Sequence, residues 1–314
     1  MAALSTTHSA RTPRQCRLAC ALGLALLALM CSRGWSDQRV TAHDKTFWSA
    51  LRAKGFNLPD EQVMPLALEA ATLLGSTDPE LRDAVAYEAL ATWIYKDQRL
   101  AADELEKLRV LLTTNSRRGL GEKDGDELFL RSFSTLVLSV LAAEDLKKPF
   151  LDAQEFDSLV DLGIEELGRE RDLRGYTPAK GWGHATAHSA DLLKFLSRSH
   201  WLRTDQQARI VNAIAERLRS AGVVFVWGED ARLAATLTSL ARRADANPAP
   251  FEAWFTRLRE ESAAVWMGPF DPARYVPVRA QLNALSALTA NLETDTGPAA
   301  TIRAALRSLR AQAQ

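Results

Sequence analysis

The chain contains few cysteines and no surplus of either charge, and each of these shortages excludes a class of protein. Its 314 residues include three cysteines, all before residue 32, so a disulfide-dense miniprotein is excluded. Lysine and arginine together number 39, as do aspartate and glutamate, which removes the electrostatic reason to expect nucleic-acid binding. A content of 47% hydrophobic and 25% charged residues is that of a folded globular protein rather than a disordered chain.

The first 36 residues also lack acidic side chains and have the layout of a secretory signal peptide. Arg11, Arg14 and Arg17 precede an apolar stretch over residues 18–31, and a small-x-small step follows at 34–36. The apolar stretch is short for a helix that spans a hydrocarbon core of roughly 30 Å, which argues against a permanent membrane anchor. After cleavage of the signal, we expect no membrane span. The sequence predicts cleavage after Ser36 and a periplasmic or secreted protein.

Two alternatives keep the chain attached to a membrane: an uncleaved signal, or a lipid on Cys31. Cleavage would remove all three cysteines and leave 35 basic against 39 acidic residues. The remaining chain, residues 37–314, is predicted to be one domain. It could then contain no disulfide, no thiolate nucleophile and no cysteine-ligated zinc.

Beyond residue 40, apolar residues recur with helical spacing along almost the whole chain. Asp78 and Pro79 have the types expected at the start of a helix. Only residues 223–227 look strand-like, and five residues cannot form a sheet. The sequence therefore predicts an all-α protein, with helices over about 42–54, 59–74, 78–95, 100–114, 127–144, 153–169, 182–198, 204–221, 230–244, 250–266, 272–294 and 298–312.

Helices of this length joined by short turns are expected to pack as antiparallel pairs. A pair with its turns takes about 40 residues, the size of a HEAT or armadillo unit, so an irregular α-solenoid is predicted, with an α/α toroid as the alternative. The polar residues 113–126 are interpreted as a loop inside one domain. Five tryptophans are expected to pack in the core or in a groove, namely Trp48, Trp93, Trp201, Trp254 and Trp266.

One segment departs from ordinary amphipathic sequence. A glycine-rich turn that contains Tyr176 and Trp182 leads into a predicted helix on which His184, His188 and Asp191 have the spacing i, i+4 and i+7. This spacing places the three side chains on one face of the helix. We therefore predict a polar pocket around them, with Trp182 near its mouth.

Two histidines one turn apart, with a carboxylate, could hold a divalent metal such as zinc. Ala185 stands where a zinc metalloprotease needs its glutamate, so that motif is excluded. The same residues could instead satisfy buried polar groups at a helix interface, or perform acid–base chemistry without a metal. The sequence leaves these three interpretations open, with His184, His188 and Asp191 as the candidate metal ligands.

Two further polar elements are candidates for the same pocket. Glu229 and Asp230, just before Arg232, either cap a helix or face the histidine pair. Arg131 lies in an apolar run, where it is either exposed or buried and paired with Asp191, Glu229 or Asp230. The candidate pocket residues are thus Arg131, Tyr176, Trp182, His184, His188, Asp191, Glu229, Asp230 and Arg232.

Four stretches of this sequence resemble a bacterial family of domains of unknown function. They are LRDAVAYEALATWI (81–94), FLRSFSTLVL (129–138), RDLRGYTPAKGWGHATAHSADLL (171–193) and GEDARLA (228–234), so the resemblance covers about 81–240. The resemblance implies an all-α fold, and six residues match the positions of the family's motifs: His184, His188, Asp191, Glu229, Asp230 and Arg232. It implies no activity.

Two functions therefore compete, and the sequence does not decide whether the protein is an enzyme. The first is an exported helical-repeat module that binds a peptide, an envelope component or another protein in the pocket around His188. The second is a metal-dependent hydrolase in which His184, His188 and a carboxylate activate water.

Overall fold

The computed structural model describes residues 43–312, almost all of them in helices or the short loops between them. The predicted signal peptide, its cleavage site and Cys31 lie outside the described residues. The α-helices are α2 (Lys45–Ala53), α3 (Asp60–Leu73), α4 (Glu88–Ala91), α5 (Ala102–Ser116), α6 (Glu127–Asp145), α7 (Ala153–Arg169), α8 (Ala185–Leu196), α9 (Thr204–Ser220), α10 (Glu229–Ala241), α11 (Ala249–Val265), α12 (Pro272–Asn291) and α13 (Pro298–Gln312). The all-α prediction is confirmed.

Helix α4 is continuous with two π-helical turns, η1 (Glu80–Tyr87) before it and η2 (Thr92–Lys96) after it. As predicted, Asp78 caps this composite helix, because its Oδ1 accepts the Glu80 N–H at 2.9 Å. In the part of the chain that the structure describes, no helix is both long and apolar enough to cross a membrane.

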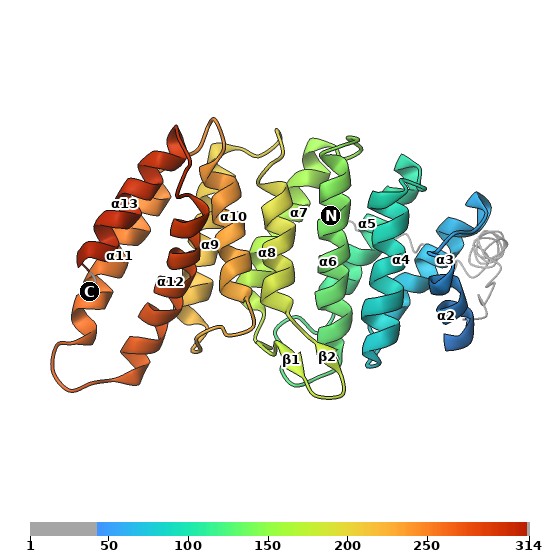
Figure 1. The fold of residues 1–314 in the computed structure, drawn as a ribbon, viewed down its shortest axis with the longest axis horizontal. Helices are drawn as coiled ribbons and strands as arrows, with labels where there is room; N and C mark the ends of the chain where they lie inside the picture. The colour runs from blue at the N-terminus through green and yellow to red at the C-terminus, as the bar shows by residue number, and fades with distance from the viewer. Residues whose placement is uncertain (1–42, 313–314) are drawn as a thin grey trace, which may run out of the picture. The chain divides into compact units, whose positions relative to one another are not determined.

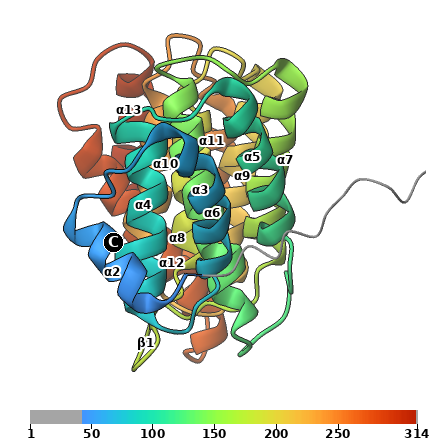
Figure 2. The same cartoon turned by 90° about the vertical axis from the view of Figure 1, so that its right-hand side faces the viewer.

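The helices from α6 onward pack in two rows (Figures 1 and 2). In one row α6 contacts α8, α8 contacts α10 and α10 contacts α12; in the other α7, α9, α11 and α13 follow one another in the same way. Helices α6, α8, α10 and α12 all begin towards the lower edge of Figure 1, because each is separated from the next by one antiparallel helix. The finer assignment to a solenoid or a toroid stays a prediction.

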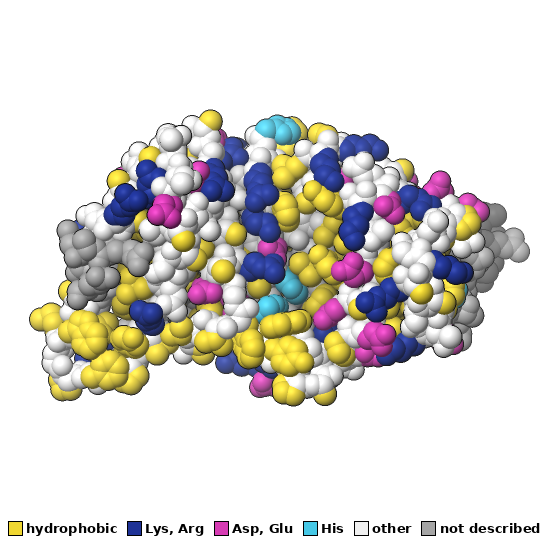
Figure 3. Space-filling view, viewed as in Figure 1, with side chains coloured by type: hydrophobic (Ala, Val, Ile, Leu, Met, Phe, Trp, Pro, Cys, Tyr) yellow, Lys and Arg dark blue, Asp and Glu magenta, His cyan; other side chains and the backbone are white. Residues whose placement is uncertain are grey.

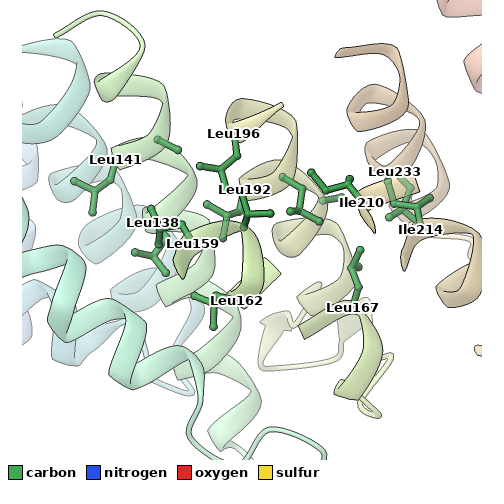
Figure 4. Packing of buried hydrophobic residues seen from close by; sticks show 14 of the residues in the cluster. Leu138, Leu141, Leu159, Leu162, Leu167, Leu192, Leu196, Ile210, Ile214 and Leu233 are labelled. Atoms are coloured by element: carbon green, nitrogen blue, oxygen red, sulfur yellow. The ribbon is translucent and has the colours of Figure 1, made fainter. Parts of the chain in front are cut away.

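Leucine and isoleucine side chains fill the space between the rows (Figure 4). They recur three or four residues apart on each helix, so each helix turns one apolar stripe to its neighbours. Labelled examples are Leu138 and Leu141 on α6, Leu159 and Leu162 on α7, Leu192 and Leu196 on α8, Ile210 and Ile214 on α9, and Leu233 on α10. Burial of these stripes is the main stabilising term of the fold.

Tryptophans divide between the core and the surface. Trp48, Trp93 and Trp254 are almost completely buried, as expected, and Trp201 is half-buried. The expectation for Trp266 is wrong, since 70% of this residue is exposed. It lies in the loop between α11 and α12, beyond the last apolar turn of α11, and the amphipathic pattern does not extend into that loop.

The one sheet among residues 43–312 is a small hairpin of β1 (Tyr176–Thr177) and β2 (Gly181–Trp182), in which Tyr176 pairs with Trp182. The strand-like residues 223–227 form no strand and belong to the loop between α9 and α10. Because the hairpin occupies residues 181–182, the predicted helix over 182–198 begins later, at Ala185. The hairpin thus sets where the histidine-bearing helix starts.

Candidate functional site

A groove of about 480 Å³ opens beside the histidine-bearing helix α8. Histidine side chains lie near the centre of the face in Figure 3, with basic side chains above them and hydrophobic ones below. The groove is bounded by the α4 region, α6, α8 and α10. It is lined by Tyr87, Ala91, Tyr95, Lys96, Leu136, Ser139, Val140, Ala143, His188, Asp191, Lys194, Phe195 and Arg232. Of the predicted pocket residues, His188, Asp191 and Arg232 are therefore brought together here.

His188 contributes an imidazole whose Nδ1 is held by α6. Nδ1 lies 2.8 Å from the Ser132 hydroxyl oxygen and 3.1 Å from the Ser132 carbonyl oxygen. The Ser132 hydroxyl donates its proton to the Gly183 carbonyl. A carbonyl can only accept and the hydroxyl proton is already used, so Nδ1 carries the ring proton. Nε2 is therefore the nitrogen of His188 that can accept a hydrogen bond from a ligand.

The environment of His188 keeps its ring neutral. The residue is buried, and the Phe133 ring packs edge-on against it with centroids 5.0 Å apart. This burial lowers the pKa of His188 to about 3, and the nearby Asp191 carboxylate opposes the shift only in part. The side chain thus offers the groove a neutral acceptor rather than a positive charge.

His184 occupies a strained position at the N-terminus of α8, with φ 54°. Its Nε2 lies 3.0 Å from the Trp227 carbonyl oxygen and 3.8 Å from Glu229 Oε1, and its ring stacks on Trp182 with centroids 4.4 Å apart. Burial lowers the pKa of His184. His184 therefore lies next to His188, with ring centroids 6.0 Å apart, but outside the groove lining.

The carboxylate of Asp191 is held by two cations. Lys194 Nζ lies 2.8 Å from Oδ1, and Arg232 Nη1 binds Oδ2. The metal interpretation of His184, His188 and Asp191 stays a prediction, and both Asp191 carboxylate oxygens already have cationic partners. Within residues 43–312, no three histidine, cysteine, aspartate or glutamate residues form a group that could hold a metal ion.

Glu229 and Asp230, at the start of α10, have different surroundings. Glu229 is buried, and its Oε2 accepts the Trp227 N–H at 3.0 Å while its Oε1 faces His184. Asp230 is half-exposed and accepts the Ala231 N–H at 2.8 Å. The expectation of a carboxylate facing a histidine is thus met by Glu229 and His184, whereas Asp230 stays at the helix start.

Arg131 is buried, but its partner is none of the three acids named from the sequence. It pairs with Glu170, which follows α7 directly, and its Nη2 also donates to the Glu122 carbonyl at 3.3 Å. The predicted pairing with Asp191, Glu229 or Asp230 is wrong because Arg131 lies on the side of α6 that faces the end of α7, away from the groove.

A second buried polar cluster, around Glu166, was not anticipated. Thr135 and Ser189 donate to its two carboxylate oxygens at 2.7 and 2.9 Å. Complete burial raises the pKa of Glu166 to about 7, and these hydrogen bonds offset only part of the shift. The signal was available in the sequence, because Glu166 falls on the same face of α7 as Leu159 and Leu162.

Arg82 is a second residue that sequence reasoning missed, and it fixes the hairpin. Its guanidinium donates to the Ser76 carbonyl at 2.8 Å and to the Lys180 carbonyl at 2.7 Å. It also lies over the Phe129 ring, 4.3 Å from the centroid. Gly181 is required beside it, because φ is +72° there and a Cβ would lie 3.0 Å from Arg82.

The remaining predicted residues, Tyr176 and Trp182, form a surface cluster with Trp227. The Tyr176 and Trp182 ring centroids are 5.1 Å apart, and those of Trp182 and Trp227 are 5.9 Å apart. Trp227 lies directly over Gly175, where a Cβ would come within 2.1 Å of its ring. All three rings are exposed. They lie beside His184 on the surface and do not line the groove.

Comparison with known proteins identifies a family and nothing beyond it. The family described as "Protein of unknown function (DUF2785)" matches residues 117–289, more than half of the chain. This segment contains all nine predicted pocket residues, whereas the stretch 81–94 lies outside it. No curated protein and no solved structure matches the chain. The chain therefore belongs to the DUF2785 family of proteins of unknown function.

Proposed function

We propose that the protein is an exported binding module whose groove holds the carboxylate end of a peptide. Export rests on the basic, acid-free start and the short apolar stretch of residues 1–36. The binding role rests on the groove beside α8, and its charge balance is the observation that carries the proposal.

The charged side chains that line the groove are three cations and one carboxylate: Lys96, Lys194 and Arg232 against Asp191. Asp191 compensates part of this positive charge, and Glu88, outside the lining but 3.8 Å from Lys96 Nζ, compensates another part, which leaves an excess of one positive charge. Half of Arg232 is exposed, so the guanidinium has donors left for a ligand after Nη1 binds Asp191. In a chain whose net charge is zero, this local excess favours an anionic ligand.

The other lining groups favour an anion that is part of a peptide. Nε2 of His188 can accept one N–H, as an amide next to a carboxylate would provide. Leu136, Val140 and Phe195 provide apolar contacts for a side chain. A planar carboxylate also suits the fork of the Arg232 guanidinium.

Titration calorimetry with N-acetyl-alanyl-leucine and its C-terminal amide tests this proposal. We expect the free acid to bind at least about tenfold more tightly than the amide, because charge-assisted hydrogen bonds contribute about 1.5–3 kcal/mol. Arg232→Gln should weaken binding of the acid by a similar factor, and Val140→Trp should block the groove. Arg209→Gln is the matched control, since Arg209 is equally exposed but pairs with Asp161 outside the groove.

Equal affinity for the acid and the amide would contradict the carboxylate proposal. Binding of neither peptide at concentrations up to about 10 mM would contradict a peptide-binding groove altogether.

A further inference from the structure

Exposed hydrophobic side chains of this protein gather on three loops. Among residues 43–312, eight of the twelve large hydrophobic residues that are exposed belong to the β1–β2 hairpin, the α9–α10 loop or the α11–α12 loop. We call these eight the aromatic rim: Tyr176, Trp182, Val223, Val226, Trp227, Trp266, Met267 and Phe270. Single exposed hydrophobic residues are ordinary on protein surfaces, but clusters of them mark interaction sites.

The three loops lie at the same end of the helices. The hairpin precedes α8, the second loop precedes α10 and the third precedes α12, and these helices all begin at the lower edge of Figure 1. In the same view, Figure 3 shows hydrophobic side chains along this edge, from its centre to its left end. The rim therefore has two clusters on one edge rather than one compact patch.

The rings of the rim are held in place. Arg274, in the first turn of α12, donates to the Ala264 carbonyl at the end of α11 and to the Met267 and Pro269 carbonyls in the loop between the two helices, at 2.9–3.2 Å. Phe270 packs against Trp266, with ring centroids 6.2 Å apart. Trp266 and Met267 nevertheless remain 70% and 71% exposed. Three hydrogen bonds from Arg274 thus hold this loop in place while its largest apolar side chains point into water. This combination indicates an interaction surface.

The cations beside the rim are already paired. Lys180 binds both carboxylate oxygens of Asp126, at 2.7 and 2.9 Å, and Arg274 lies 3.5 Å from Asp271. A strongly charged partner is therefore not indicated. Tryptophan and tyrosine, with an apolar body and a polar N–H or O–H, favour the headgroup region of a bilayer. An extended lipid plane can also receive two separate clusters at once.

We propose that the aromatic rim seats the protein on a lipid bilayer surface, with its rings in the headgroup region and no dependence on anionic lipid. The proposal does not involve the groove beside α8. It is also separate from the predicted signal peptide, because it rests only on residues 176–270.

Co-sedimentation of the full chain with phosphatidylcholine vesicles tests the proposal. Trp266→Ser, Met267→Ser and Phe270→Ser, combined, should lower the partition coefficient at least about tenfold, because three inserted apolar side chains are lost. The matched control combines Val110→Ser with Leu146→Ser, two exposed apolar residues outside the rim, and should bind like the unaltered chain. Adding phosphatidylglycerol or about 0.5 M salt should change little, since no charge is invoked. Circular dichroism verifies that each variant is folded.

A second measurement reads the loop itself and is independent of residues 1–42. Oxidation of Met267 by peroxide, followed by mass spectrometry, should slow at least about fivefold when vesicles are added, while half-buried Met64 serves as the internal reference. Unchanged oxidation of Met267 would overturn the proposal. So would binding only to anionic vesicles at low salt, or a dimer that vesicles do not affect and that the triple substitution abolishes.

Discussion

Arg131 and Glu170 form a two-pronged ion pair in the interior, with Nε 2.6 Å from Oε2 and Nη2 3.0 Å from Oε1. Each side chain is only 3% exposed. Glu170 Oε1 also accepts the Asp172 N–H at 2.7 Å, so the pair anchors the segment that leads from α7 to the hairpin. Neither charge has access to water that could replace its partner.

Replacement of one member of this pair should therefore lower the free energy of unfolding more than replacement of both. We expect Arg131→Met to lower the free energy of unfolding by about 3–5 kcal/mol, because Glu170 is left as an unpaired buried charge. The double variant with Glu170→Met should lose less than this single variant, although the Asp172 N–H loses its acceptor. Urea unfolding of the two variants measures the difference. A double variant less stable than Arg131→Met would contradict the argument.

Glu166 should make stability fall as the pH rises. Its pKa is 4.5 in an unfolded chain and about 7 in the folded protein, so the unfolded state releases its proton first. The free energy of unfolding therefore falls by about 3 kcal/mol in total as the pH rises from about 4.5 to about 7. Glu166→Gln should remove this loss, which unfolding at pH 5 and pH 8 can measure. The half-buried neighbour Glu165→Gln is the control and should leave the loss unchanged.

His188 should act in the opposite direction. Its pKa of about 3 lies below the unfolded value of 6.5, so the unfolded chain takes up a proton first as the pH falls. The stability that the neutral ring contributes is complete above pH 6.5 and is lost towards pH 3. His188→Ala should cost about 1–3 kcal/mol at pH 7 and clearly less at pH 4. Exposed His200→Ala should cost little at either pH, and a constant cost of His188→Ala would show the argument to be wrong.

Two glycines without positive φ should respond in opposite ways to alanine. A Cβ at Gly175 would lie 2.1 Å from the Trp227 ring, so Gly175→Ala should push that ring aside and cost about 1–3 kcal/mol. Gly168 lies in α7 with open space around it, and Gly168→Ala should stabilise the protein by about 0.5–1 kcal/mol. Thermal unfolding of both variants tests the pair, and equal shifts would refute the packing argument.

Helical spacing predicted the fold class because burial of an apolar stripe is a local property of the sequence. The start of the histidine-bearing helix was placed three residues too early, since a hairpin of two-residue strands leaves almost no periodic signal. Val223 and its neighbours suggested a strand by composition alone. No other strand lies beside them, and they form a loop.

The candidate site was predictable where residues share one helix. His188 and Asp191 line one groove as expected, because a separation of three residues fixes their relative direction on α8. Partners from other helices depend on how those helices pack, which spacing does not encode. For this reason the Arg131–Glu170 pair was missed, and so was the ion pair between Asp191 and Arg232.

The contact of Arg82 with the Lys180 carbonyl links two parts of the chain that are 98 residues apart. Arg82 precedes the residues that the family matches, and the hairpin lies inside them. A protein cut at residue 117 would leave that carbonyl without its donor and uncover the ring of Phe129, on which the guanidinium rests. We therefore expect the foldable unit to extend beyond the residues that match the family, and expression of residues 117–289 alone to give an incompletely folded chain.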